Sequence, residues 1–339
     1  MTDKRWRLSD FDYSLPSELV AIRPSQRRGD SRLMHVSRKL GTIDHLHISD
    51  LPRVLNPPST IVLNRSKVLP ANFSLQRSSG GRVSVLLIEQ RTAMMWRAML
   101  KPAKRIQAGE TLLAEDGTPV MTAVRRDPDH HRYMHVELLD EKHWSYGRIP
   151  LPPYLRRDAD AVDLDRYQTV YADRLGSVAA PTAGLHFTES LMERLVADGH
   201  TMAKVTLHVG PGTFLPVTAE DPTHHEIHSE GIETDSSLAE AISNARLQSA
   251  PVVAVGTTSV RTLESTKGQV FNGKTDLFIF PGYTFSTVDQ LITNFHLPKS
   301  SLLMLVSAFM GYDLMREAYR QAIENEYRFY SYGDAMYIS

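Results

Sequence analysis

The chain has 339 residues, with 38 lysines and arginines against 39 aspartates and glutamates, 42% apolar residues and no cysteine. This composition is typical of an ordinary globular protein, and a chain of this length buries enough surface to fold without disulfides or metals. The absence of cysteine excludes thiolate catalysis, cysteine zinc sites and iron–sulfur clusters. We expect one large domain or two smaller ones.

The first ten residues are charged and have no apolar run behind them, so they predict neither a secretory signal nor a membrane anchor. The longest apolar run, residues 302–310, is far shorter than the roughly 20 residues that a membrane-spanning helix needs. We therefore expect a cytoplasmic protein with no membrane partner.

Two stretches concentrate positive charge. Residues 23–39 hold basic side chains opposed by Asp30, and residues 65–105 hold basic side chains opposed by Glu89 alone. Such clusters attract polyanions such as nucleic acids, and a merely solvated basic face is the alternative. In the second stretch the candidate RNA-binding residues are Arg77, Arg82, Arg97, Lys101, Lys104 and Arg105.

Residues 72–149 carry short apolar segments separated by turn residues. Strands are predicted at residues 83–88, 96–100, 120–124 and 133–138. The turns between them contain glycine or proline, as in residues 79–81 and 116–117. Closely spaced strands of this kind predict a small β-barrel or sandwich.

The flanking sequence alternates between strand and helix patterns. Strands are predicted at residues 202–209, 251–255, 277–280 and 291–294, and helices at residues 189–198, 236–248, 259–267, 299–309 and 313–324. Thr188 and Asp313 are predicted N-caps, Gly199 and Gly311 are predicted stops, and Pro298 suits a first helical turn. Alternation predicts an α/β domain, made of residues 1–71 and 150–339 and interrupted by the β domain of residues 72–149.

Two motifs resemble ligand sites but lack the required context. Residues 268–275 match the phosphate-loop pattern G-x-x-x-x-G-K-[ST], yet a helix-like segment precedes them and a strand-like segment follows, so we interpret Asn272-Gly273 as a turn. Residues 224–228 are rich in histidine but lack metalloprotease spacing and a cysteine to complete a zinc site. We therefore predict no metal site.

Three segments place small or hydroxyl side chains beside predicted strand ends, where α/β proteins bind ligands. Residues 176–188 lead to His186, and a packing turn is the alternative. Residues 206–214 bring His208 to a glycine-rich turn, and a core histidine is the alternative. Residues 253–261 place glycine and hydroxyls at a helix start, which favours an anion, although ordinary capping explains the hydroxyls equally well.

These segments resemble those of the S-adenosylmethionine:tRNA ribosyltransferase-isomerases of queuosine biosynthesis. The similar motifs keep their order along the chain: F-D-Y-x-L-P at 11–16, S-R-L at 31–33, I-P-L-P-P-Y at 149–154, Y-Q-T-V-Y-A at 167–172, G-S-V-A-A-P-T-A-G-L-H-F-T at 176–188, T-L-H-V-G-P-G-T-F at 206–214, H-S-E at 228–230, V-G-T-T-S-V-R-T-L-E-S at 255–265, F-P-G-Y at 280–283, T-N-F-H-L-P-K-S at 293–300 and Y-R-F-Y-S-Y-G-D-A-M at 327–336. Three positions depart from the usual pattern: Arg65 replaces an acid, Asn72 an arginine and Gly231 a bulky aromatic.

The resemblance implies an α/β catalytic domain with an inserted small β-barrel. It implies that the ribosyl part of S-adenosylmethionine is transferred and isomerised onto the aminomethyl-deazaguanine base at the tRNA wobble position, giving epoxyqueuosine and releasing adenine and methionine. S-adenosylmethionine is then a substrate, no cofactor is expected, and the partner is tRNA bearing the precursor base. We expect a monomer. The alternatives are a non-catalytic RNA-binding paralogue and a sulfonium-dependent transferase acting on a small molecule.

For this reaction the candidate bases are His186 and His208, since imidazole titrates near neutrality. The candidate substrate-binding residues are Ser177, Ala179, Ala180, Pro181, Thr182, Gly184, Phe187, Thr206, Gly210, Gly212, Thr213, Phe214, His228, Glu230, Gly256, Thr257, Thr258, Arg261, Tyr283, Asn294 and His296. Among these, the turn at Gly256 and Arg261 would hold the methionine carboxylate, Glu230 would neutralise the substrate amino group, and aromatic rings would face the sulfonium.

Overall fold

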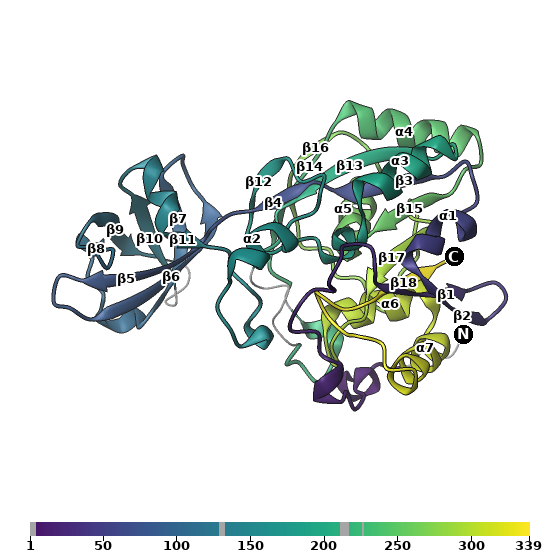
Figure 1. Cartoon of the computed structure of the whole chain (residues 1–339), viewed down its shortest axis with the longest axis horizontal. Coiled ribbons are helices and arrows are strands. Elements are labelled where there is room, and N and C mark those ends of the chain that lie inside the picture. Colours follow the sequence, from purple (N-terminus) through teal and green to yellow (C-terminus); the bar gives the residue numbers. More distant parts are fainter. Residues whose placement is uncertain (1–4, 129–132, 211–216, 226) are drawn as a thin grey trace. The chain divides into compact units, whose positions relative to one another are not determined.

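The computed structural model describes residues 5–128, 133–210, 217–225 and 227–339. The chain forms two units (Figure 1). Unit 1 comprises Met1–Ser66, Thr169–Asp173 and Pro181–Ser339, and unit 2 comprises Lys67–Gln168 and Arg174–Ala180. The expected fold class, an α/β domain built from both ends of the chain with an inserted small β-barrel, is confirmed.

Unit 1 is built on a nine-stranded sheet in the order β16-β14-β13-β3-β15-β17-β18-β1-β2. Its strands are β1 (Arg32–Ser37), β2 (Thr42–His47), β3 (Thr60–Asn64), β13 (Thr201–Leu207), β14 (Glu230–Thr234), β15 (Val252–Val255), β16 (Phe271–Thr275), β17 (Gln290–Asn294) and β18 (Ala335–Ile338). The four central strands β13, β3, β15 and β17 run parallel. β18 inserts between β17, to which it is antiparallel, and β1, to which it is parallel.

Helices cover both faces of this sheet. They are α1 (Leu51–Val54), α3 (Glu189–Ala197), α4 (Ser236–Leu247), α5 (Thr257–Thr266), α6 (Ser301–Met310) and α7 (Tyr312–Glu324), with short 3₁₀ turns η1 (Leu8–Phe11), η2 (Ser17–Leu19), η3 (Ile48–Asp50), η7 (Thr182–His186) and η9 (Pro222–His224). Because successive side chains of a strand point to opposite faces, Val62 packs with α4–α7 whereas Ile61 and Leu63 pack with α1 and α3. Burial on both faces explains why central strands such as β3 and β15 are almost entirely apolar.

Unit 2 is a small barrel whose strands follow the order β5-β6-β7-β10-β9-β8, closed by pairing of β8 with β5. Its elements are β5 (Asn72–Arg77), β6 (Arg82–Gln90), β7 (Met95–Lys101), η4 (Ala103–Arg105), β8 (Glu110–Leu113), β9 (Pro119–Arg126), β10 (Tyr133–Leu138), η5 (Glu141–Tyr146), β11 (Gly147–Arg148), η6 (Pro153–Leu155) and α2 (Ala161–Arg166), and β4 (Ser66–Val68) pairs with β12 (Arg174–Ser177). Side chains such as Phe73, Val85 and Trp96 fill the interior. Closure leaves few unpaired strand edges.

Four local expectations are wrong. Residues 277–280 form no strand, and Asn272-Gly273 is not a turn, because β16 (Phe271–Thr275) runs through it as the antiparallel edge partner of β14. Asp313 lies inside the first turn of α7, whose N-cap is Gly311 at φ +89°. Pro298 precedes α6, which begins at Ser301 and is capped by Ser300. By contrast, Thr188 caps α3 as expected, accepting from the Leu191 amide at 3.1 Å.

No helix within the described ranges combines the length and the apolarity needed to cross a bilayer.

Candidate functional site

The predicted ligand-binding segments meet along one edge of the unit 1 sheet. The parallel strands β3, β13, β15 and β17 end there, at or just before Asn64, His208, Gly256 and Asn294. β14 is antiparallel to β13, so its first residue, Glu230, lies at the same edge. We call this row of strand ends the site edge. Carboxyl ends of parallel strands are where open α/β sheets bind their ligands.

His186 is held at the site edge by side chains from distant parts of the chain. Its Nδ1 lies 2.9 Å from the Ser31 hydroxyl and its Nε2 lies 3.1 Å from the Asn294 amide nitrogen. The Asn294 carbonyl oxygen accepts from Thr182 at 3.0 Å, and its amide also donates to the Tyr330 carbonyl at 3.1 Å. These contacts orient the Asn294 amide, so His186 Nε2 accepts and Nδ1 carries the hydrogen.

The surroundings keep His186 neutral. The side chain is buried, with the residue 3% exposed, and burial together with the cations Arg28 and Arg328 lowers its pKa to about 4. Both ring nitrogens are already engaged in hydrogen bonds. The ring therefore cannot accept a further proton without losing the bond from Asn294.

His208 has a different environment. Its backbone N–H donates to the Gly231 carbonyl at 3.0 Å, but its buried Nδ1 has no hydrogen-bond partner within the part of the chain that the structure describes. Burial lowers the pKa of His208, opposed by the nearby Glu233 carboxylate. A Cβ at Gly231 would meet the His208 ring at 4.0 Å, so this departure from the family pattern lies directly beside the imidazole.

A buried ion pair stands next to His208. Arg261 Nη1 donates to Glu230 Oε2, Arg261 Nε donates to the Leu277 carbonyl at 3.0 Å, and Glu230 Oε1 accepts from the Gly210 amide at 3.0 Å. Both residues are only 6% exposed. Among the described residues Arg261 Nη2 has no partner, so a buried donor remains for a ligand atom.

Asn64 organises the site edge, and the candidate list from sequence omits it. Its amide nitrogen donates to the Leu207 carbonyl at 3.0 Å and lies 3.2 Å from the Thr258 hydroxyl, while its oxygen accepts from the Leu207 and Ser66 amides at 3.1 Å. One buried side chain thus connects the ends of β3 and β13 to the start of α5. A polar residue at the end of an apolar run, T-I-V-L-N at 60–64, is the sequence feature that could have identified Asn64.

The structure gives other candidates different surroundings. Phe187 is fully buried in the core against α3, and Tyr283 donates to Glu264 at 3.2 Å, which with burial raises the pKa of Tyr283 to about 12. A Cβ at Gly184 would lie 2.0 Å from the Tyr171 hydroxyl, so protein fills the space beside this glycine. His228 is exposed.

The remaining candidates fall into three groups. Thr206 is buried and accepts from Arg65 at 3.3 Å, while Thr257 and Thr258 lie at the start of α5 beside Gly256, the N-cap at φ +88°. Pro181 and Thr182 begin η7 in unit 1, whereas Ser177, Ala179 and Ala180 belong to unit 2. Gly212, Thr213 and Phe214 lie outside the described residues.

Arg65, another departure from the family pattern, is compensated within unit 1. Its guanidinium lies 3.3 Å from the Asp235 carboxylate and 3.7 Å from that of Asp173. The basic side chain at this position has therefore acquired acidic partners.

The candidate RNA-binding residues of unit 2 divide into two kinds. Arg77 pairs with Glu110 at 2.6 Å and Arg97 pairs with Asp127 at 2.8 Å, so each has its charge locally balanced. Arg82, Lys101, Lys104 and Arg105 are exposed and have no ion-pair partner among the residues described for this unit. Only the second kind presents uncompensated positive charge to solvent.

No group of three or more histidine, aspartate or glutamate side chains in the described ranges could hold a metal ion.

Fold and site together define an α/β protein with an inserted six-stranded barrel and a candidate ligand site across parallel strand ends. The family described as "Queuosine biosynthesis protein" has a model that matches residues 8–338. An S-adenosylmethionine:tRNA ribosyltransferase-isomerase of Symbiobacterium thermophilum is 48% identical over 344 residues, covering 98% of this chain and 99% of the relative. The enzyme of the same name from Staphylococcus saprophyticus is 44% identical, covering 97% and 98%.

A crystal structure of an S-adenosylmethionine tRNA ribosyltransferase from Thermotoga maritima is also similar, with a TM-score of 0.56 and 34% identity over 97% of this chain and 100% of that chain. The chain belongs to the queuosine biosynthesis protein family.

Proposed function

We propose that this chain is an S-adenosylmethionine:tRNA ribosyltransferase-isomerase. It moves the ribosyl part of S-adenosylmethionine onto the aminomethyl-deazaguanine base of tRNA, isomerises it to epoxyqueuosine, and releases adenine and methionine. The observation that carries this proposal is the full-length similarity to relatives of that name, together with a site edge that gathers the shared motifs.

In this proposal His208 is the general base and His186 is a positioning residue. Proton removal beside the sulfonium carbon requires a ring nitrogen with an unused lone pair. His208 Nδ1 is unpartnered among the described residues, whereas both nitrogens of His186 already bind Ser31 and Asn294. Because burial lowers the pKa of His208, its imidazole is neutral at neutral pH and can accept a proton.

The methionine carboxylate is placed at the start of α5. The first amides of a helix favour an anion, and Arg261 offers a buried Nη2 from the same helix. Glu230 binds the other end of this guanidinium, so its role is to orient Arg261 rather than to neutralise the substrate amino group. In this proposal Asn294 orients His186, and His296 contacts the ribose.

Several finer features belong to the same proposal. S-adenosylmethionine is consumed as a substrate with no further cofactor, the partner is tRNA bearing the precursor base, and the protein works as a cytoplasmic monomer. The exposed cations of unit 2 bind tRNA phosphates without reading sequence.

Incubation with S-adenosylmethionine, with and without precursor-bearing tRNA, tests the reaction. We expect adenine release that requires the tRNA. Release without tRNA would identify a small-molecule transferase, and no release alongside tRNA binding would identify a non-catalytic RNA-binding paralogue.

Substitution of the two imidazoles tests the assignment of the base. We expect His208→Ala to lower the rate of adenine release at saturating substrates by about 10²- to 10⁴-fold. His200→Ala is the matched control, because His200 is an imidazole whose ring nitrogens have no hydrogen-bond partner among the described residues, but it precedes β13 instead of following it. Near-normal turnover of His208→Ala would remove this residue from the mechanism.

A further inference from the structure

We propose that the N-terminal segment of residues 8–13, here called the strap, positions the loop of residues 294–299 for the reaction, and that Tyr13 is a positioning residue acting through His296. The inference rests on the proposed function, since this segment carries Asn294 of the site edge and His296, a candidate substrate-binding residue. Tyr13 is not among the candidate site residues predicted from the sequence.

Tyrosine hydroxyls bind the backbone of His296 at both its N–H and its C=O. Tyr13 donates its hydroxyl hydrogen to the His296 carbonyl, and the Tyr319 hydroxyl accepts from the His296 amide at 3.0 Å. The Tyr13 and Tyr319 rings meet edge to face with centroids 5.3 Å apart. Because the peptide groups before and after the His296 Cα are each bound by a tyrosine, the backbone at His296 is held between the strap and α7.

The strap also binds the far end of the loop. The Lys299 amide donates to the Phe11 carbonyl at 2.8 Å, and the Lys299 ammonium lies 2.6 Å from the Asp12 carboxylate. Lys299 has a left-handed backbone conformation, with φ +58°, which an L-residue adopts only when its neighbours hold it there. Two consecutive strap residues therefore stabilise a strained point of the loop.

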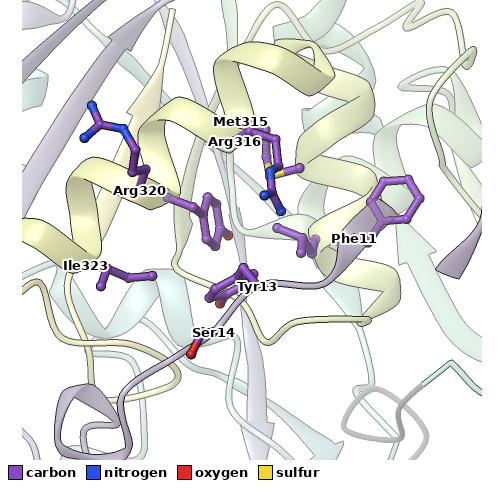
Figure 2. A pocket seen from close by; sticks show the side chains of 9 residues that line it. Phe11, Tyr13, Ser14, Met315, Arg316, Arg320 and Ile323 are labelled. Atoms are coloured by element: carbon purple, nitrogen blue, oxygen red, sulfur yellow. The ribbon is translucent and has the colours of Figure 1, made fainter. Parts of the chain in front are cut away.

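A pocket of about 190 Å³ lies between the strap and α7. Figure 2 shows Phe11, Tyr13 and Ser14 together with the α7 side chains that line this pocket. Arg316 of α7 lines it too and donates to the Asp12 carbonyl at 2.6 Å. The strap therefore meets α7 through ring contacts and directional hydrogen bonds at the rim of a cavity, and the hydrogen bond of Tyr13 adds a directional constraint on its position.

The positioned loop connects directly to the proposed chemistry. Asn294 fixes the tautomer of His186, and His296 Nε2 lies 2.9 Å from the Thr293 hydroxyl, so both side chains depend on the path of this backbone. Removing the Tyr13 hydroxyl would leave the ring contacts in place and would remove only the hydrogen bond to the His296 carbonyl. Small displacements of positioning groups are known to reduce turnover strongly.

Tyr13→Phe tests the inference. We expect kcat for adenine release to fall about fivefold or more while the KM for tRNA and the thermal midpoint change little. Tyr337→Phe is the matched control, because it removes one hydroxyl of a buried tyrosine that donates to Gln290 at 2.7 Å, at the other end of β17. If Tyr13→Phe behaves like Tyr337→Phe, the positioning role is wrong.

A double substitution separates action through His296 from a general structural effect. We expect Tyr13→Phe combined with His296→Gln to lose no more turnover than His296→Gln alone, since both changes act on one unit. Fully multiplicative losses would overturn the inference.

Amide hydrogen exchange supplies a readout that does not depend on activity. We expect Tyr13→Phe to accelerate exchange at His296 and Lys299 and to leave the β17 amides protected. Unchanged exchange at the His296 and Lys299 amides would contradict the proposed positioning role of the strap. If the unmodified enzyme releases no adenine, the proposed function fails, while this measurement still decides whether the strap fixes the loop.

Discussion

At the scale of single residues, the site distinguishes two histidines that look equivalent in the sequence. Each follows a strand or turn rich in small residues. Their difference comes from partners far along the chain, since Ser31 and Asn294 lie 155 and 108 positions away from His186. Spacing cannot reveal such partners, so the sequence predicts the pair of imidazoles but not their separate roles.

The buried, neutral state of His186 predicts a specific dependence of stability on pH. Its folded-state pKa of about 4 lies below the unfolded value near 6.5, so between these values the unfolded chain binds more protons. The free energy of unfolding therefore decreases as pH falls from 6.5 to 4, by about 3 kcal/mol from this residue. Chemical unfolding followed by circular dichroism measures it. His186→Gln should lack this contribution, and an identical pH profile in the variant would contradict it.

At the scale of elements, η7 shows why a run of small residues need not indicate an open ligand surface. Gly184 of η7 has no side chain because Tyr171 occupies the adjoining space. Gly256, by contrast, has a positive φ of +88° at the N-cap of α5, and a Cβ there would find only ordinary contacts at 3.5 and 3.6 Å. Gly184 is needed because a side chain there would clash, whereas Gly256 is needed because the backbone there adopts a positive φ.

The packing at η7 can be tested by enlarging Gly184. We expect Gly184→Ala to lower the free energy of unfolding by about 1–3 kcal/mol, because its Cβ would overlap the Tyr171 hydroxyl at 2.0 Å. Tyr171→Phe removes that oxygen, so the double variant should recover part of the loss in thermal unfolding. Additive destabilisation of the two changes would show that the overlap is not the cause.

The elements themselves are predictable to different extents. Apolar runs correctly indicate β13, β15 and β17, whose residues are buried on both faces. Residues 277–280 are equally apolar but pack against the core without pairing with a strand of the sheet. An apolar segment indicates that its residues are buried. Whether the segment forms a strand also depends on a neighbouring strand with free backbone hydrogen-bonding groups, and the local sequence does not specify that neighbour.

At the scale of the whole molecule, charge is organised by unit rather than by net value. The formal net charge is −1, yet the barrel of unit 2 presents Arg82, Lys101, Lys104 and Arg105 without compensating acids among its described residues. Arg126 donates to the carbonyls of Ala103 and Ile106 at 3.2 Å and so holds η4, which carries two of these cations. The basic stretch is evident in the sequence, but which of its charges are balanced is not.

Salt dependence of tRNA affinity tests this surface. We expect Lys104→Ala/Arg105→Ala to reduce the slope of log affinity against log salt by about 2, since each lost phosphate contact removes about one unit. The control is Arg77→Gln/Glu110→Gln, which deletes an internally paired cation together with its acid and should leave the slope unchanged. Equal slopes for the first variant and the unmodified protein would place the tRNA contacts elsewhere.

The position of β18 has a consequence for how the molecule is made. Its four residues, Ala335–Ile338, bridge β17 and β1, and so join strands encoded some 250 residues apart. Until β18 has been synthesised and has inserted between them, β17 and β1 each lack a partner on the edge that faces the other. Joining the two halves of the nine-stranded sheet therefore depends on a strand that follows all the other strands of that sheet in the chain.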